Sequence, residues 1–250
     1  MNIKFKFLIF LIFVFSIVKQ SYAHELNKNK INSIIKNFIL ENPQIIEKTL
    51  QNLNLERTKQ NFEVALTELK KIPNPKLKNV NSDVIIYEFF DYNCGYCKSV
   101  MQNIFNIYKK DKKVEIVFVE YPILSNSSLS AAIASLAARN QNKYFEFHTK
   151  LMKHTGKIDD KLLLSFAEEL KIDTKKLKSD YSNEKLMLII NKNREIANRL
   201  NLRGTPAFII GNKIYPGAMS EKDIEKAIAI ERKKWILIFG DTFERQNICY

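Results

Sequence analysis

Residues 84–98 read Val-Ile-Ile-Tyr-Glu-Phe-Phe-Asp-Tyr-Asn-Cys-Gly-Tyr-Cys-Lys, an apolar run that leads directly into a Cys-x-x-Cys pair. The run has the length and composition of a buried strand, and the apolar residues after the pair recur at helical spacing. The pair therefore lies where a strand turns into a helix. Two sulfurs at i and i+3 of a helix start can close a small disulfide ring, and the helix N-terminus stabilises a thiolate on the first. This pattern predicts thiol–disulfide exchange at Cys94 and Cys97.

The first 23 residues have the pattern of an export signal. Lys4 and Lys6 precede an apolar run over residues 7–18, and Ser21-Tyr22-Ala23 places small residues where a signal peptidase cleaves. A membrane-spanning helix needs about 20 apolar residues, so an uncleaved anchor is the less favoured alternative. We therefore expect residues 1–23 to be a cleaved signal peptide and the mature chain to be periplasmic, in a compartment where disulfides persist.

Few residues of the chain could bind a metal ion. A closed zinc site needs four ligands, and no second Cys-x-x-Cys or His pair is present to complete one. We therefore predict no metal site. The histidines at 148 and 154 are expected at the surface, and the third cysteine receives no catalytic role. The complete set of cysteines and histidines is Cys94, Cys97, Cys249, His24, His148 and His154.

The chain is basic, with 40 Lys and Arg against 27 Asp and Glu and a formal net charge of +13. Its lysines are spread along the sequence without a concentrated basic stripe. A nucleic-acid or anionic membrane surface is one interpretation of this charge, and a solvated lysine-rich surface is the other. For an exported chain we favour the second, and we expect no nucleic-acid partner.

Residues 24–75 are predicted to form a separate helical segment that ends in a linker. Asn42 and Pro43 suit an N-cap and a first helical position, and Pro73 and Pro75 stop the helix. Asn42 and Pro43 divide the segment into two helices, and two helices alone cannot bury each other's apolar faces completely. The segment must therefore dock on the main domain or on another subunit.

Residues 76–233 are predicted to form one α/β domain. The strand over 84–90 and the Cys helix precede a β-prone run over 114–120, and residues 128–200 have helical patterning throughout. A hairpin around Gly211 and a final helix over 220–233 follow. The order β-α-β, helical block, β-β-α is that of a thioredoxin fold with a helical insertion. The tail 234–250 could be a strand or a continued helix.

The chain resembles the DsbA-like thiol–disulfide oxidoreductases of the thioredoxin superfamily over residues 79–233. Three motifs carry the resemblance: the strand over 86–90, the Cys94-Gly95-Tyr96-Cys97 site, and the loop Gly204-Thr205-Pro206-Ala207-Phe208. The Cys-x-x-Cys pair alone is a weak signal, but it becomes specific with a Thr-Pro some 110 residues later that opens a hairpin.

This resemblance assigns roles to particular residues. Cys94 is the nucleophile and Cys97 the resolving thiol of a redox-active disulfide, with Gly95 and Tyr96 tuning its potential, and no other cofactor is implied. The Thr205–Pro206 bond is expected to be cis, so that the Thr205 backbone faces Cys94 and pairs with a substrate strand. The family places an acid at Glu88, beneath the site, to move protons to and from the buried cysteine. The alternative for Glu88 is an outward-facing strand residue. Tyr92 and Asn93 are expected at the rim of the site, and Phe89 and Phe90 in the core.

Two redox functions share these sulfurs, and the pattern favours isomerisation over oxidation. Cys-Gly-Tyr-Cys with a Thr before the cis proline is similar to periplasmic isomerases. Residues 37–46 look like the appendage through which ScsC-like, copper-tolerance-associated members oligomerise. The implied partners are exported client proteins with cysteines, a membrane redox partner that resets the site, and further copies of the chain bound through residues 24–71. The alternatives are a monomeric dithiol oxidase, a Cu(I)-binding protein that uses the two soft thiolates, and a dimerising scaffold with a structural disulfide.

Overall fold

The computed structural model of the protein describes residues 28–246, and its centre is a five-stranded sheet with the strand order β1-β3-β2-β4-β5. β2 and β3 are parallel, and all other neighbouring pairs are antiparallel. Both long strands have the bounds that the sequence predicts. The five strands are β1 (Lys76–Leu77), β2 (Val84–Phe90), β3 (Val114–Glu120), β4 (Ala207–Ile210) and β5 (Lys213–Pro216).

One face of the two central strands alternates acidic and phenylalanine side chains. The register pairs Glu88 with Phe118, and Phe90 with Glu120. Because paired residues, and residues two apart on a strand, point to the same face of a sheet, all four lie on one face. Each is at most 2% exposed. The ring of Phe105, in the helix after β2, lies 6.0 Å from that of Phe118, so this helix covers the face.

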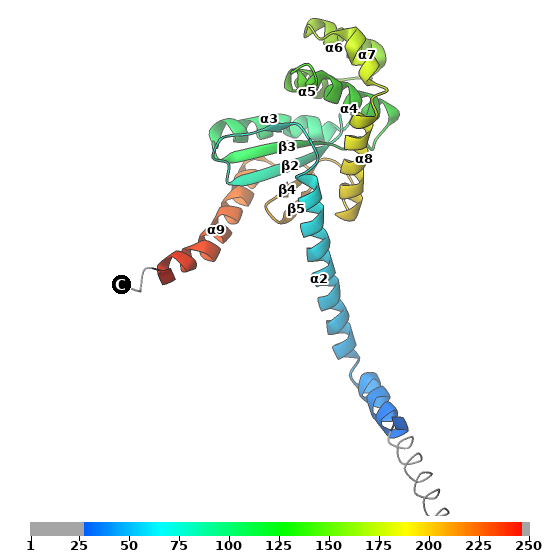
Figure 1. The fold of residues 1–250 in the computed structure, drawn as a ribbon, viewed down its shortest axis with the longest axis vertical. Coiled ribbons are helices and arrows are strands. Elements are labelled where there is room, and N and C mark those ends of the chain that lie inside the picture. Colours follow the sequence, from blue (N-terminus) through cyan, green and yellow to red (C-terminus); the bar gives the residue numbers. More distant parts are fainter. Residues whose placement is uncertain (1–27, 247–250) are drawn as a thin grey trace, which may run out of the picture. The chain divides into compact units, whose positions relative to one another are not determined.

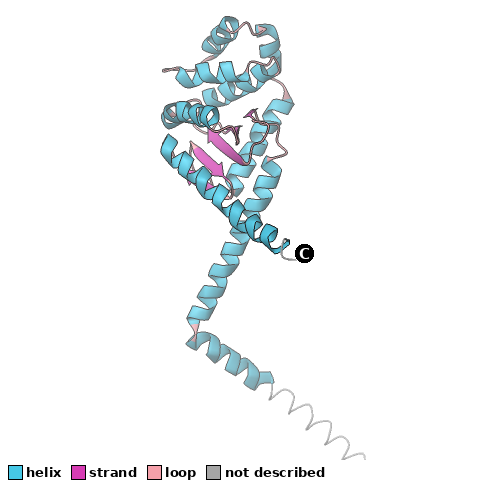
Figure 2. Ribbon diagram, turned by 90° about the vertical axis from the view of Figure 1, so that its left-hand side faces the viewer, coloured by secondary structure: helices cyan, strands magenta, loops and turns pink. Residues whose placement is uncertain are grey.

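Helices lie on both sides of the sheet (Figures 1 and 2). α3 (Gly95–Lys110) follows β2, and α9 (Glu221–Gln246) follows the β4–β5 hairpin and contacts α3. The predicted helical insertion lies between β3 and β4. Side chains of Ser125, Asp159, Asp173 and Asn183 cap four of its helices, which fixes where these begin. The insertion consists of α4 (Asn126–Arg139), α5 (Tyr144–Lys153), α6 (Asp160–Glu169), α7 (Thr174–Asp180) and α8 (Glu184–Arg199).

The last helix settles a question that the sequence leaves open. α9 continues without a break from Glu221 to Gln246, so residues 234–246 of the tail extend the final helix of the domain. Cys249 and the expected signal peptide lie outside the described residues.

The N-terminal part is helical, as predicted, with one helix over 28–41 and a second, α2 (Pro43–Leu69). The chain divides into two compact units at residue 60, inside α2, and we call residues 60–250 the main unit. In the first unit the apolar residues of the helix over 28–41 are exposed, each by 42% or more. In the main unit, Ala65 and Leu69 at the end of α2 are buried in the core.

Residues 72–75, where the sequence predicts a linker after the helix, are packed within the main unit, so this part of the prediction is wrong. Asn74 and Asn193 of α8 exchange two amide hydrogen bonds of 3.0 and 2.9 Å, and both side chains are buried. The carbonyl of Pro75 accepts from Phe118 N at 2.8 Å. Proline lacks an N–H but keeps its acceptor, so a proline-rich segment can still add to a sheet edge through its carbonyls.

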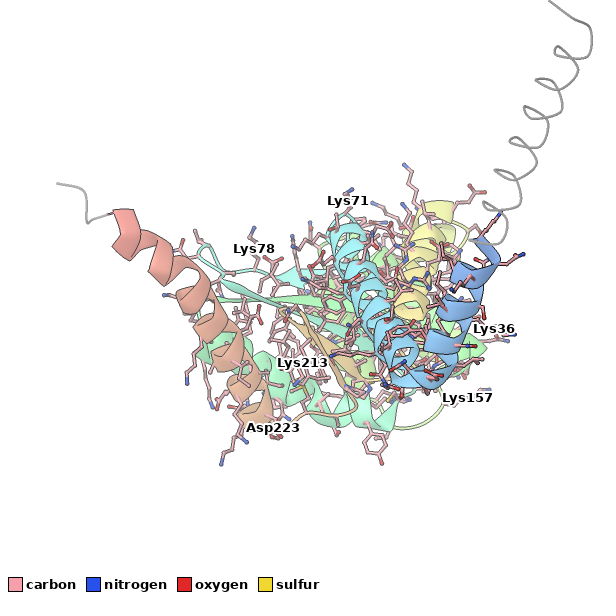
Figure 3. All side chains as sticks on the ribbon, turned by 90° about the horizontal axis from the view of Figure 1, so that it is seen from below. Lys36, Lys71, Lys78, Lys157, Lys213 and Asp223 are labelled. Carbon is pink, nitrogen blue, oxygen red and sulfur yellow. The ribbon has the colours of Figure 1, made fainter. Side chains whose placement is uncertain are left out.

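Lysines are distributed over many elements of the main unit. The labelled side chains Lys71, Lys78 and Lys213 extend from separate parts of it (Figure 3). Within residues 28–246, no helix is both long and apolar enough to cross a membrane.

Candidate active site

Cys94 is the N-cap residue of α3, with extended backbone angles (φ −82°, ψ 113°), and the helix begins at Gly95. Its sulfur accepts a hydrogen bond at 3.3 Å from Cys97 N, one of the backbone N–H groups that a helix start leaves without a partner in its own helix. Both cysteines are free thiols in the structure. Cys94 is 6% exposed and Cys97 is fully buried. Cys94 is therefore the more accessible of the two, as predicted, although both residues are largely buried.

The Thr205–Pro206 peptide bond is cis, as the resemblance implies. The thiol of Cys94 donates to the Thr205 carbonyl at 3.2 Å, although 111 positions separate the two residues. Pro206 also bounds a pocket of about 300 Å³, whose other lining residues include Ile214 and Gly217. The structure therefore brings the predicted nucleophile to the predicted substrate-pairing loop, and this loop lines the pocket.

Burial determines the protonation of the second thiol. Desolvation raises the pKa of Cys97 far above the ordinary range, against a smaller opposing effect of a backbone hydrogen bond with Asp91. Cys97 is therefore a neutral thiol at physiological pH. It can attack a mixed disulfide only after a base has removed its proton.

Glu88 lies in the central strand and is 2% exposed, so the outward-facing alternative is wrong. Burial raises the pKa of its carboxyl to about 8. Its Oε1 has no hydrogen-bond partner within the protein. Glu88 shares its sheet face with Phe90, and α3, which carries Cys97, covers that face. A carboxyl in this setting can exchange a proton near pH 8, as the proton-transfer role requires.

Asp91 and Asn93, which precede the nucleophile, connect its turn to the loop after β3 through hydrogen bonds. Asp91, 1% exposed, accepts from Ile123 N and Leu124 N at 2.8 and 3.0 Å and from Asn93 N at 2.8 Å. The Asn93 amide lies within 3.0 Å of the hydroxyls of Ser125, Ser127 and Ser128 at the start of α4. Asp91 is not among the residues that the sequence predicts for the site, although a carboxyl three residues before a helix-capping cysteine is a typical turn-forming residue.

Tyr92 and His148 are both placed wrongly by the sequence argument. Each is 1% exposed instead of lying at the rim or the surface. Tyr92 O–H donates to Glu120 at 2.9 Å and lies 3.0 Å from His148 Nδ1. His148 occupies a position of amphipathic α5 that faces the Phe90 and Phe118 rings, each 5.0 Å away. Its spacing from Tyr144, four residues earlier on the same helix face, is the signal that could have located it in the core.

Tyr96 and His154 differ in their exposure. Tyr96 is 71% exposed, and His154 is half-buried. The His154 carbonyl accepts from Lys98 Nζ at 2.6 Å. No group of three or more His, Cys, Asp or Glu side chains that could hold a metal occurs within the described part of the chain.

A sequence profile of the thioredoxin family matches residues 77–229, from β1 into α9. The chain belongs to the thioredoxin superfamily, among its DsbA-like members. The predicted fold, a thioredoxin domain with a helical insertion behind a helical N-terminal segment, is thereby confirmed.

Solved structures show the same relationship. A thioredoxin-like oxidoreductase from Silicibacter pomeroyi is 36% identical and covers 66% of this chain and 96% of its own, with a TM-score of 0.64. The thiol-disulfide exchange protein alpha-DsbA2 from Wolbachia pipientis is 30% identical, with coverages of 69% and 94% and the same TM-score. The catalytic domain of Proteus mirabilis ScsC, at 22% identity and a TM-score of 0.63, shares the fold.

Among curated proteins, disulfide bond formation protein D of Bacillus subtilis is 25% identical over 171 residues, which are 64% of this chain and 77% of that protein. Another relative, Na(+)/H(+) antiporter NhaA 1 of Salinispora arenicola, is 22% identical over 147 residues. The chain spans 22% of that protein's length, so this similarity concerns one part of the antiporter.

Proposed function

We propose that this DsbA-like protein is a thiol:disulfide oxidoreductase that forms and reshuffles disulfides in exported client proteins. One observation carries the proposal: Cys94 Sγ lies both at the N-terminus of α3, 3.3 Å from Cys97 N, and 3.2 Å from the Thr205 carbonyl. The sulfur at the helix start thus faces backbone with which an extended client segment can pair strand to strand. The similarity to a thiol-disulfide exchange protein and a disulfide bond formation protein supports it.

Oxidation of a client begins from a Cys94–Cys97 disulfide. A client thiolate attacks Cys94 Sγ, which forms a client–Cys94 bond and releases Cys97 as a thiolate. A second client thiolate then attacks the client sulfur of the mixed disulfide and releases the Cys94 thiolate. The client loses two electrons, the Cys94–Cys97 pair gains them, and a membrane redox partner must remove them to reset the site.

Reshuffling begins from the dithiol. The Cys94 thiolate attacks a client disulfide, and the released client thiolate attacks another client sulfur. A final client thiolate displaces Cys94, so no net electron transfer occurs. When a client stays attached, Cys97 attacks Cys94 Sγ, which closes the Cys94–Cys97 disulfide and releases the client in reduced form.

Glu88 is proposed to exchange the proton of Cys97. Burial makes the Cys97 thiolate a costly species, so its formation as a leaving group is favoured by protonation from a nearby acid, and its attack requires deprotonation by a base. Glu88, with its pKa raised to about 8 by burial, is populated in both forms near neutral pH. It can therefore act in both directions.

The N-terminal segment favours the isomerase alternative. The helix over 28–41 exposes apolar side chains at the spacing of one helix face: Ile31, Ile34, Ile35, Phe38 and Ile39. Monomeric proteins rarely expose a contiguous apolar stripe, so we propose that residues 24–71 join copies of this chain. Several sites held around one client would raise the effective thiol concentration there. We further propose that the signal peptide is cleaved after residue 23 and that the mature chain is periplasmic.

The test is refolding of a scrambled, multi-disulfide client by the purified protein. Cys94→Ser should abolish activity. A double substitution, Ile34→Glu with Phe38→Glu, should disperse the oligomer and remove most isomerisation while leaving exchange with glutathione intact. Asn37→Glu, on the same exposed helix, is the matched control and should leave assembly unchanged. Mass in solution is measured by sedimentation.

Each outcome separates the alternatives. Equal refolding activity of the wild type and the dispersed double variant would argue against the oligomeric isomerase and in favour of the monomeric dithiol oxidase. A protein that binds Cu(I) tightly and shows no thiol–disulfide exchange would refute the enzymatic proposal.

A further inference from the structure

Four buried polar side chains meet behind the turn that presents Cys94. Tyr92 O–H donates to Glu120 Oε1 at 2.9 Å, and Tyr144 O–H donates to the same oxygen at 2.8 Å. Tyr92 Oη also lies 3.0 Å from His148 Nδ1. All four residues are at most 3% exposed, and the exchange mechanism uses none of them.

The donors and acceptors of this cluster can be assigned. The single hydroxyl proton of Tyr92 is directed at Glu120, so the bond to His148 requires a proton on Nδ1 that points at the Tyr92 oxygen. Burial lowers the pKa of His148 to about 3, so its ring is neutral and adopts the Nδ1–H form. Tyr92 is therefore held from two sides, by β3 through Glu120 and by α5 through His148.

The backbone of Tyr92 belongs to the active-site turn. Cys94 N donates to the Asp91 carbonyl at 3.1 Å, which makes Tyr92 and Asn93 the two central residues of a four-residue turn. The Phe90 ring contacts the Tyr92 ring edge-on, with centroids 5.2 Å apart, and fixes its plane. A side chain locked in this way restricts where the turn can place the next residues.

Cys94 Sγ depends on that placement. Its contacts with Cys97 N and the Thr205 carbonyl, at 3.3 and 3.2 Å, both lengthen when the turn moves. Hydrogen bonds weaken steeply once their geometry is lost, so a small shift would reduce thiolate stabilisation.

We propose that Glu120 and Tyr92 are positioning residues for thiol–disulfide exchange: Glu120 holds the Tyr92 hydroxyl, and Tyr92 holds the turn that keeps Cys94 Sγ at the start of α3. The inference rests on the proposed function of Cys94. It extends the site from the sulfurs to the β3–α5 side of the core.

The test compares two substitutions, each of which removes one of the two tyrosine hydroxyls that donate to Glu120 Oε1. Tyr92→Phe loses the hydroxyl that belongs to the turn, and Tyr144→Phe loses the hydroxyl that belongs to α5. The readouts are the equilibrium constant of the purified protein with glutathione, its rate of reaction with glutathione disulfide, and its thermal unfolding.

Tyr92→Phe should shift the equilibrium constant toward the disulfide by about tenfold, which corresponds to about 30 mV for a two-electron couple, because the reduced form loses thiolate stabilisation. Tyr144→Phe should stay within about twofold of the wild type, although it loses a comparable hydrogen bond. Glu120→Gln should also stay near the wild type, because its amide oxygen still accepts from both phenols.

Equal equilibrium constants for Tyr92→Phe, Tyr144→Phe and the wild type would overturn the proposal, because the cluster would then stabilise the fold alone. Equal shifts in both variants would overturn it as well, since the effect would not pass through the turn. If Tyr92→Phe does not fold, Tyr92→Phe with Glu120→Gln replaces the buried carboxyl that has lost a donor by a group that cannot ionise, and it should show the same shift. A wild-type protein that does not react with glutathione disulfide would refute the proposed function itself, and this inference with it.

Discussion

Replacement of Glu88 by glutamine should make the protein more stable and its exchange reaction slower. The carboxyl is buried in the central strand, and one of its oxygens has no partner. Glutamine has nearly the same shape and carries no titratable proton. The substitution therefore removes the titrating group without opening a cavity.

The magnitude follows from the pKa of Glu88, which burial raises from 4.5 to about 8. Between these values the folded protein retains a proton that the unfolded chain releases, so stability falls as pH rises through the window and the loss is complete above about pH 8. One pKa unit corresponds to about 1.4 kcal/mol. The full difference is about 5 kcal/mol, of which about 3 kcal/mol accrues between about pH 5 and pH 7.

The assay is urea unfolding under reducing conditions at several pH values between about 5 and 8. The free energy of unfolding of Glu88→Gln minus that of the wild type should grow by about 3 kcal/mol from about pH 5 to pH 7. Taking the difference cancels contributions from Glu120, whose pKa burial also raises to about 8. Glu195→Gln, at an exposed position of α8, measures the effect of amide substitution itself.

The same variant tests the proton-transfer role. Release of a mixed disulfide by Cys97 should slow by about 100-fold or more, because a positioned general acid or base typically contributes about 10²- to 10⁴-fold. Parallel stability curves for the variant and the wild type would refute the burial argument. Unchanged release kinetics would remove Glu88 from the mechanism even if the stability prediction holds.

Three further outcomes follow from the structure. Cys97→Ser should accumulate mixed disulfides between Cys94 and clients, visible on non-reducing gels, whereas Cys94→Ser should form none. Asn193→Ala should lower the free energy of unfolding by about 2–4 kcal/mol, because it strands the Asn74 amide and removes a 3.1 Å bond to the Glu120 carbonyl; chemical denaturation checks this. Gly211→Ala should lower it by about 1–2 kcal/mol, because Gly211 adopts φ +61° and its new methyl would meet the Glu231 carboxyl, while the rate of exchange with glutathione stays unchanged.

Local patterns predicted much of the fold. The strands over 84–90 and 114–120 have the predicted bounds because long β-prone apolar runs leave few alternatives. The helix after Cys94 was found from its apolar spacing, and the hairpin from Gly211. β1 was missed because its two residues carry no pattern of their own and are fixed only by pairing with β3.

Errors in the site have a common origin. His148 and Tyr92 lie 56 positions apart, and Tyr92 and Glu120 lie 28 apart, so no local spacing relates them. A polar residue between apolar ones was assigned to the surface. Here the active-site turn and α5 pack against each other across the Phe90 and Phe118 rings, so Tyr92 and His148 have no solvent to face.

The sequence alone determined that Cys94 and Cys97 stand where a strand becomes a helix, because strand and helix periodicities are properties of neighbouring residues. The tertiary structure decided three things: that Thr205, 111 positions away, faces Cys94, that Glu88 is buried with its Oε1 unpartnered, and that Tyr92 is anchored to Glu120 and His148. Each depends on which elements pack against which. Desolvation and hydrogen bonding between residues distant in sequence exist only once that packing is complete.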